Sequence, residues 1–167
     1  MEWGWSPFIN NEGNVVNTFD SMSDNDWFWN DSDERMNQEF IQKEIELNNI
    51  TSEQFTKDQK TVKFHGHCYQ KALTNQKSSF DVLNLPENYK VTIIPSGCCG
   101  MAGSFGYEKD KYEVSTQIGE QTLFPAVRKA TKETIIAANG TSCRHQIKDG
   151  TNRSAKHPVT ILREALL

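Results

Sequence analysis

The sequence predicts an α/β fold, in which a small parallel sheet carries helices on its faces in a Rossmann-like arrangement. Three short segments, 60–65, 89–94 and 133–138, combine apolar and β-branched side chains in the manner of strands. Helical patterns separate these segments, and strands that alternate with helices pair in parallel through right-handed crossovers. Cysteines follow all three segments closely. We therefore expect the thiols at the carboxyl edge of the sheet, where open α/β sheets bind their ligands.

The first elements of the predicted fold are a helix and a strand. Residues 36–48 carry apolar side chains at helical spacing and end in asparagine, which predicts an amphipathic helix. In residues 60–65, Val62 and Phe64 alternate with polar neighbours, as in a strand with one buried face. This strand leads directly into the first cysteine-bearing segment.

The middle of the chain holds the second strand. Residues 69–73 have a helical pattern, and a short helix is expected over 80–85 because Pro86 would end it. Residues 89–94 have the alternation of a strand, which Pro95 stops. A glycine-rich turn then takes the place of regular structure.

The last third of the chain adds the third strand and more helices. A polar helix is expected over 107–119, and another begins at Pro125, because proline is common in first helical turns. Residues 133–138 form the third strand. A short helix is expected to open at Cys143, and a final helix follows Pro158 with its apolar side chains on one face.

Composition limits the class of protein. The chain has 167 residues, which suits one domain, and its net charge of −4 without a basic run excludes nucleic acid as an expected partner. No apolar stretch is long enough to cross a bilayer, and the N-terminus does not resemble a signal peptide. We therefore expect a cytoplasmic protein, free or peripheral to the inner face of the membrane. In that reducing compartment we expect the four cysteines to serve as ligands or redox groups rather than as a disulfide framework.

The N-terminal residues differ from the rest of the chain. Residues 1–34 hold eight acidic residues, no basic residue and all four tryptophans, without a helical or strand period. Acidity without periodicity is typical of solvated chain, so we expect a poorly ordered arm. A docking segment with aromatic anchors is the alternative. Residues 35–167 form the predicted domain.

The candidate metal ligands are the four cysteines, Cys68, Cys98, Cys99 and Cys143. Adjacent side chains on a strand point to opposite faces, but a glycine-rich turn allows Cys98 and Cys99 to face one site. Soft metals and iron–sulfur clusters use thiolates of this kind. The alternative is that the cysteines pack as small buried apolar groups, which suits single cysteines better than four at three strand ends.

Other residues near the cysteines are candidate cofactor contacts. The backbone N–H groups at Gly97 and Gly100 could donate to cluster sulfur, and Arg144 could balance negative charge, unless it is a solvated helix residue. His67 could ligate a metal or donate to sulfide, or else satisfy local backbone groups. For His65 we favour the last of these roles, a hydrogen bond to a nearby backbone group.

Three stretches of the sequence resemble a known family: HGHCYQKAL at 65–73, SGCCGMAGSFGYEK at 96–109 and TSCRHQI at 141–147. They resemble the cysteine-rich CCG domain of heterodisulfide reductases and of the iron–sulfur subunits of glycolate oxidase and anaerobic glycerol-3-phosphate dehydrogenase. The likeness is greatest to the C-terminal end of fusions between an FAD-linked 2-hydroxy-acid dehydrogenase and an iron–sulfur oxidoreductase. It covers roughly residues 36–167.

The resemblance implies an iron–sulfur cluster, such as a 4Fe–4S cluster, whose ligands are Cys68, Cys98, Cys99 and Cys143. Zinc is the alternative metal. The sequence departs from the family at Gly140, where the first cysteine of a CxxC pair is expected.

The resemblance also implies a place in a larger oxidoreductase. The chain would relay electrons from reduced FAD, bound on a partner domain or chain, to a quinone or a redox protein. It would be part of an oxidoreductase and not catalytically complete alone. The alternatives are a zinc-binding or metal-free docking module of such a complex, and a truncated remnant.

Overall fold

The structure is a computed structural model that describes residues 40–73 and 76–167. The arm predicted over residues 1–34 lies outside the described residues, as does the start of the helix predicted over 36–48. Residues 40–46, which belong to that predicted helix, are helical. The domain boundary predicted at residue 35 stays a prediction.

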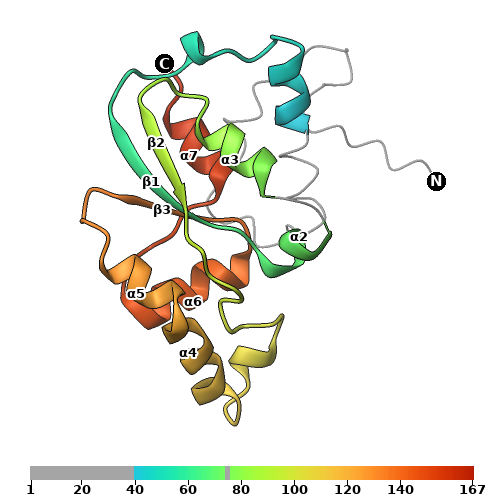
Figure 1. The fold of residues 1–167 in the computed structure, drawn as a ribbon, viewed down its shortest axis with the longest axis vertical. Coiled ribbons are helices and arrows are strands. Elements are labelled where there is room, and N and C mark those ends of the chain that lie inside the picture. The colour runs from blue at the N-terminus through green and yellow to red at the C-terminus, as the bar shows by residue number, and fades with distance from the viewer. Residues whose placement is uncertain (1–39, 74–75) are drawn as a thin grey trace, which may run out of the picture. The chain divides into compact units, whose positions relative to one another are not determined.

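A parallel three-stranded sheet lies at the centre of the described fold (Figure 1). Its strands are β1 (Lys60–His65), β2 (Tyr89–Ile93) and β3 (Ile135–Ala138), in the order β2-β1-β3. Both neighbours of β1 run parallel to it, so all three carboxyl ends share one edge. The predicted α/β class is confirmed. Because neighbouring strands lie only ~4.8 Å apart, the loops that leave this edge can meet.

Helices follow each of the strands. Together with the short 3-10 helices η2 and η3, the elements are η2 (Ser52–Gln54), α2 (Cys68–Leu73), α3 (Lys77–Leu83), η3 (Phe105–Tyr107), α4 (Tyr112–Gln121), α5 (Leu123–Arg128), α6 (Thr141–Thr151) and α7 (Pro158–Glu164). The helix predicted over 107–119 is divided between η3 and α4. The helix expected at Cys143 begins earlier and is longer, so that Cys143 lies in its first turn.

Two groups of helices pack against the sheet. α3 and α7 contact each other, whereas α5 contacts both α4 and α6 on the other side of the strands (Figure 1). Side chains alternate along a strand, so Lys63 and His65 of β1 face opposite to Val62 and Phe64. The Lys63 ammonium donates to the carbonyl oxygen of Ala126 in α5 at 3.4 Å. His65 therefore faces the side of the sheet that α5 and α6 cover.

The ring of Phe124 in α5 holds the second group of helices together. It is buried and lies against Gly119 of α4 and Gly150 of α6, where a Cβ atom on either glycine would overlap the ring. Truncating a buried aromatic side chain of this kind typically costs ~3–5 kcal/mol. This packing fixes α6, and with it Cys143, against its neighbours.

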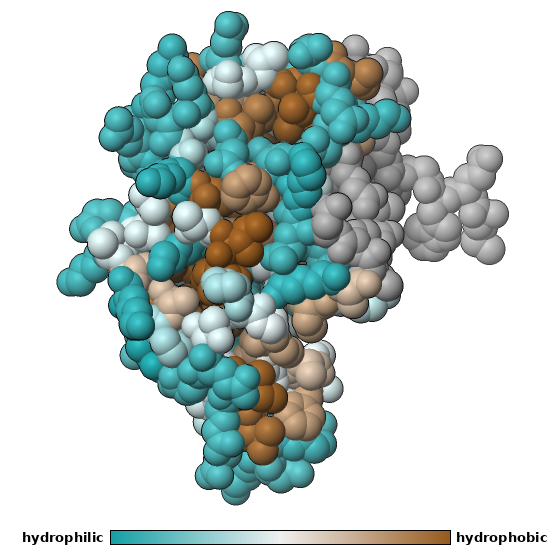
Figure 2. Space-filling view, viewed as in Figure 1, coloured by the Kyte–Doolittle hydropathy of each residue, from teal (hydrophilic) through white to brown (hydrophobic). Residues whose placement is uncertain are grey.

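The surface is mostly hydrophilic in the view of Figure 2, with hydrophobic side chains gathered in the upper part, over the middle and at the lower end near η3 and α4. Tyr107, Tyr112 and Val114 of these lower elements are exposed. Within residues 40–73 and 76–167, no helix is long and apolar enough to cross a membrane.

Candidate metal centre

The loops after the three strands carry the cysteines predicted as ligands. Cys68 opens α2 shortly after β1, and Cys143 lies in the first turn of α6 after β3. Cys98 and Cys99 lie in the glycine-rich turn after β2, and all four cysteines are free thiols. Their loops leave the same edge of a parallel sheet, which is why residues far apart in sequence meet here.

The four thiols form a continuous series of contacts. Each thiol affects the pKa of a neighbour in the series: Cys98 that of Cys68, Cys99 that of Cys98, and Cys143 that of Cys99. Cys99 and Cys143 are buried, whereas Cys68 and Cys98 are partly exposed. One end of the series is enclosed by the fold, and the other end approaches the surface.

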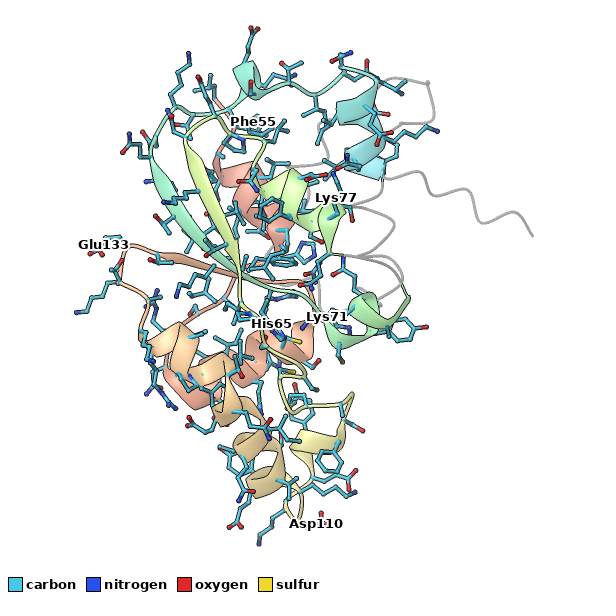
Figure 3. The ribbon with its side chains drawn as sticks, viewed as in Figure 1. Phe55, His65, Lys71, Lys77, Asp110 and Glu133 are labelled. Carbon is cyan, nitrogen blue, oxygen red and sulfur yellow. The ribbon has the colours of Figure 1, made fainter. Side chains whose placement is uncertain are left out.

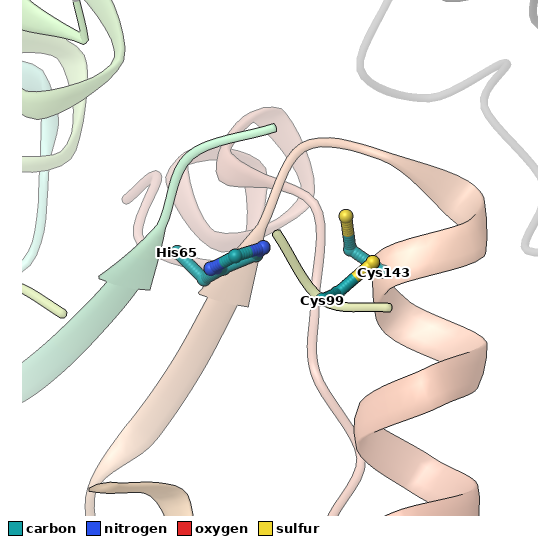
Figure 4. Close-up of side chains that lie close together, drawn as sticks. All are labelled: His65, Cys99 and Cys143. Atoms are coloured by element: carbon teal, nitrogen blue, oxygen red, sulfur yellow. The ribbon is translucent and has the colours of Figure 1, made fainter. Parts of the chain in front are cut away.

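A histidine joins the buried end of this series. A ring nitrogen of His65 and the Sγ atoms of Cys99 and Cys143 lie within 4.8 Å of one another (Figure 4). We call these three buried residues the inner group, and Cys68 with Cys98 the outer pair. Figure 4 shows the inner group converging from β1, the glycine-rich turn and α6. Three separate elements thus direct metal-binding side chains to one point.

Ser96, in the loop after β2, positions the ring of His65. Its Oγ lies 2.7 Å from His65 Nδ1, and both residues are buried. The other ring nitrogen, Nε2, is buried and has no hydrogen-bond partner among the residues that the structure describes. Burial, and to a lesser extent the charge of Lys71, lowers the pKa of His65 to about 3, so the ring is neutral at pH 7. We expected His65 to satisfy local backbone groups, but it bonds a side chain from another loop.

The turn that carries Cys98 and Cys99 requires glycine at residue 100. Gly100 has a φ of +104°, which residues with side chains rarely adopt. A Cβ atom on Gly100 would also overlap the carbonyl oxygen of Ser115 in α4. In this conformation the N–H of Gly100 donates to Cys98 Sγ, with 3.3 Å between nitrogen and sulfur. The turn therefore orients backbone donors toward the thiols.

Lys71 is a residue near the thiols that the sequence patterns did not single out. Its ammonium donates to the carbonyl oxygens of Ser96 at 2.6 Å and Gly97 at 2.8 Å, which ties α2 to the loop after β2. Burial lowers the pKa of Lys71, and all four thiols oppose that shift, so its charge lies within electrostatic range of the whole series. Figure 3 shows His65 and Lys71 near each other at the carboxyl end of the sheet. The available signal was spacing, since Lys71 follows Cys68 by three residues on one helix.

Burial and neighbouring thiols raise the pKa values of three cysteines. For Cys68, burial is the largest cause and Cys98 the next. The contact with Cys99 is the largest cause for Cys98, and the contact with Cys143 raises the pKa of Cys99 to about 12. Backbone N–H groups act in the opposite direction at all three. A bound metal cation deprotonates such thiols, because its charge reverses the local electrostatics.

Gly140 lies where the resemblance leads us to expect another cysteine. A Cβ atom on Gly140 would lie 2.7 Å from His67 Cδ2 and 3.3 Å from Cys143 Sγ. The ring of His67 therefore occupies the space that a side chain at 140 would take. His67, predicted as a cofactor contact, lies beside Cys143 but is not one of the three residues whose donor atoms converge.

Arg144 and Gly97 take up less direct positions. The Arg144 guanidinium donates to the carbonyl oxygens of Ala138, at 3.1 Å, and Asn139. These bonds fix the link between β3 and α6, and the cofactor contact predicted for Arg144 stays a prediction. At Gly97, no described atom lies within 4 Å of where a Cβ atom would be. Its carbonyl oxygen, rather than its N–H, has the observed partner, Lys71.

A surface hollow lies beside the glycine-rich turn. It is a cavity of about 400 Å³ whose lining includes Met101, Tyr107, Tyr112, His145 and Asp149. Tyr107 Oη lies 2.7 Å from His145 Nδ1, and Tyr112 Oη donates to Asp149 at 2.7 Å. Burial first and then Cys99 raise the pKa of Tyr107, so this wall of the hollow is within electrostatic range of the inner group.

The fold and the site together define a class of protein. It is a small α/β domain whose sheet edge carries thiols and an imidazole that could bind a metal. Sulfur and imidazole ligands suit zinc, iron and iron–sulfur clusters rather than hard cations such as Mg²⁺. The orphaned Nε2 of His65 and the N–H donor to Cys98 both fit such a group.

Curated proteins similar to this chain are dehydrogenases or their subunits. The chain is 29% identical over 105 residues to a subunit of the anaerobic glycerol-3-phosphate dehydrogenase of Escherichia coli (strain K12), a match covering 63% of this chain and 26% of that protein. It is 32% identical over 104 residues to D-2-hydroxyglutarate dehydrogenase of the same strain, covering 62% of this chain and 10% of that protein. The chain is 37% identical over 73 residues to D-2-hydroxyglutarate dehydrogenase of Pseudomonas putida, and this match covers 44% of this chain and 7% of that protein.

The chain spans about a quarter of the length of the first of these relatives and a tenth or less of the others. No protein-family model matches it, and no solved structure matches it. The similarity to dehydrogenase proteins is therefore shown, and the narrower assignment to the CCG domain is a proposal.

Proposed function

We propose that this chain is a CCG-type module that binds an iron–sulfur cluster and transfers electrons within a flavin-linked 2-hydroxy-acid oxidoreductase. The observation that carries the proposal is the convergence of four thiols and one imidazole at the carboxyl edge of the sheet. The similarity to dehydrogenase proteins supports the same conclusion. We assign cofactor binding to Cys68, Cys98, Cys99 and Cys143.

The residues around the thiols have roles that suit such a cofactor. A bound cluster supplies one-electron transfer. The N–H of Gly100 donates to sulfur, and donors of this kind raise the potential of a cluster. The Lys71 ammonium lies within electrostatic range of all four thiols and balances negative charge that a thiolate-bound cofactor would bring. Burial of Cys99 and Cys143 keeps water from this side of the site.

The position of the site suits exchange of electrons with a partner. The outer pair is partly exposed, so a cofactor held there lies near the surface. The hollow lined by Tyr107 and Tyr112 lies beside the glycine-rich turn that carries Cys98 and Cys99, and both tyrosines are exposed. We propose that a flavin-containing dehydrogenase domain or subunit delivers electrons here, for transfer to a quinone or a redox protein. The module would work in the cytoplasm, free or at the inner face of the membrane.

A zinc-binding docking module is the second candidate. The inner group favours it, because one imidazole and two thiols within 4.8 Å provide three of the four ligands that structural zinc takes. Zinc undergoes no redox change. In that case the exposed surface would serve a partner and the site would carry no electrons.

Anaerobic purification with metal and sulfide analysis tests the proposal. We expect iron and acid-labile sulfide with visible absorption, and a paramagnetic signal on reduction or oxidation. Cys98→Ser and Cys143→Ser should each lose the iron and sulfide. Ile161→Val, a buried substitution in α7 outside the cluster that holds Cys99 and Cys143, serves as the control for loss of stability alone.

The outcomes separate the candidates. Zinc without sulfide would support the docking module and exclude electron transfer by this site. Full retention of iron and sulfide in both cysteine variants would contradict the ligand assignment. A wild-type protein that takes up neither metal would contradict both candidates.

A further inference from the structure

We propose that His65 is a ligand of the metal centre through Nε2, so that the centre is a mixed imidazole–thiolate site built with Cys99 and Cys143. The inference rests on the proposed function, because it requires that a metal binds here. It goes beyond that function by adding a nitrogen ligand to a site that the resemblance describes by cysteines alone.

The sheet determines the direction of the His65 side chain. His65 pairs with Ala138 in the register of β1 and β3, so the two residues face the same side. Ala138 packs in the same cluster of buried residues as Cys99 and Cys143. His65 is the last residue of β1, at the edge where the thiols gather. An imidazole at this position therefore reaches the thiols without any strain in the strand.

The two ring nitrogens of His65 have different surroundings. Nδ1 lies 2.7 Å from the hydroxyl of Ser96, which is itself buried. Nε2 is buried with no hydrogen-bond partner in residues 40–73 and 76–167. Leaving a buried polar atom unpaired is costly, so such an atom calls for a partner. Metal-bound histidines commonly donate their other N–H to a fixed acceptor, the role that Ser96 Oγ fills here.

The ligand set explains why a nitrogen ligand is needed. Gly140 lacks the thiol that the family pattern would provide, and the His67 ring occupies the space at that position. Within the described chain, the donor atoms that lie within 4.8 Å of one another come from His65, Cys99 and Cys143. Small side-chain adjustments would bring all three onto one metal ion, at typical bond lengths of ~2.0–2.3 Å.

A neutral imidazole changes the charge of the centre. Each thiolate ligand brings one negative charge, whereas an imidazole brings none. For an iron–sulfur cluster this substitution shifts the reduction potential to a more positive value. We therefore expect His65→Cys, if it retains the cofactor, to have a more negative potential than the wild-type protein.

Pulsed paramagnetic resonance tests the ligand directly. The full chain, reconstituted anaerobically with iron and sulfide, is reduced and examined for coupling to nitrogen. We expect a strong coupling that changes from ¹⁴N to ¹⁵N when the protein is grown on ¹⁵N-labelled histidine. The coupling should be lost in His65→Gln and retained in His67→Gln and His157→Asn.

Co²⁺ binding is a second test, which also applies if the centre holds a single metal ion and not an iron–sulfur cluster. Co²⁺ added to the metal-free chain shows absorption bands whose intensity rises with the number of thiolate ligands. His65→Cys should intensify the sulfur-to-cobalt band relative to the wild-type protein, and His65→Ala should weaken Co²⁺ binding about 10-fold or more.

Each result has one meaning for the proposal. A loaded centre without histidine coupling, or coupling lost in His67→Gln instead, would overturn the assignment of His65 and leave the proposed function standing. A wild-type chain that binds neither iron nor Co²⁺ would overturn the proposed function and this inference together. If the His65 variants do not fold, a histidine coupling that persists in His67→Gln, His145→Gln and His157→Asn still assigns the ligand to His65, because the chain has four histidines.

Discussion

The two ends of the thiol series differ in how the fold holds them. The inner group comes from a strand, a constrained turn and a helix, and it is buried against the α5 and α6 side of the sheet. The outer pair lies at the start of α2 and in the same turn, and it is partly exposed. A rigid, enclosed end suits selection and retention of a metal, and an open end suits contact with a partner. Variants in each part test this division.

The largest expected effect is on metal affinity. Cys99→Ser should lower Co²⁺ affinity by roughly 100-fold or more, because changes even beyond the ligands cost about 10–100-fold. Cys68→Ser in the outer pair should cost less, about 10-fold. Competition with a coloured chelator measures both dissociation constants. Equal losses of Co²⁺ affinity in the two variants, or a larger loss in Cys68→Ser, would contradict the distinction between the inner group and the outer pair.

The next largest effect is on stability, and it comes from the glycine-rich turn that carries both Cys98 and Cys99. Gly100→Ala should destabilise the fold by about 1–3 kcal/mol or more, because the residue has a positive φ and its Cβ would overlap Ser115. Gly97→Ala is the matched control and should change stability by less than about 0.5 kcal/mol. Urea unfolding at pH 7 compares the two. Similar midpoints for both variants would show that the turn can adapt.

The stability of the fold should decrease in acid, because His157 at the start of α7 and His65 in the site both have lowered pKa values. Burial and the Arg144 charge lower the pKa of His157 to about 3, and its Nδ1 accepts the N–H of Val159 at the start of α7. The unfolded chain binds this proton more readily, so stability should fall as pH decreases from about 6.5 toward 3.

The measurement is the urea midpoint of the metal-free protein between pH 7 and pH 4. His157→Asn keeps a helix-capping residue and should flatten the decline. The part of the decline that remains in His157→Asn is expected from His65, whose pKa is also about 3. A wild-type midpoint that does not change with pH would contradict both assignments.

The smallest expected effect concerns Lys71, which ties α2 to the loop after β2. Lys71→Met should lower stability by about 1 kcal/mol through the lost hydrogen bonds to Ser96 and Gly97. It should also make the potential of a loaded cluster more negative, since a positive charge is removed. Lys77→Met, at an exposed ion pair with Asp81, is the control for loss of a lysine. Equal potentials in the two variants would show that Lys71 acts only on structure.

The alternation of strands and helices made the fold class predictable. Val62 and Phe64 alternate with polar residues, and the strand predicted over 60–65 has the bounds that the structure shows. The position of the cysteines after the strands followed from the same pattern, because parallel strands end at one edge. Local patterns are sufficient for conclusions of this kind.

The role of His65 could not be read from local patterns. β1 ends at His65, so the alternation of the strand does not determine where the His67 side chain lies. The pairing of His65 with Ser96 depends on how β2 lies beside β1, which joins residues 31 positions apart. The filling of the Gly140 space by His67 likewise depends on two loops that meet only in the folded chain.

The packing of Phe124 against Gly119 and Gly150 has a consequence for the electron transfer that we propose. It joins α4, whose first residue Tyr112 lines the surface hollow, to α6, which carries Cys143. Close-packed interiors resist deformation, so a protein that docks at the hollow would meet a tunnelling distance already set by the fold. A donor or acceptor could then exchange an electron without the module rearranging, which keeps the reorganisation energy low.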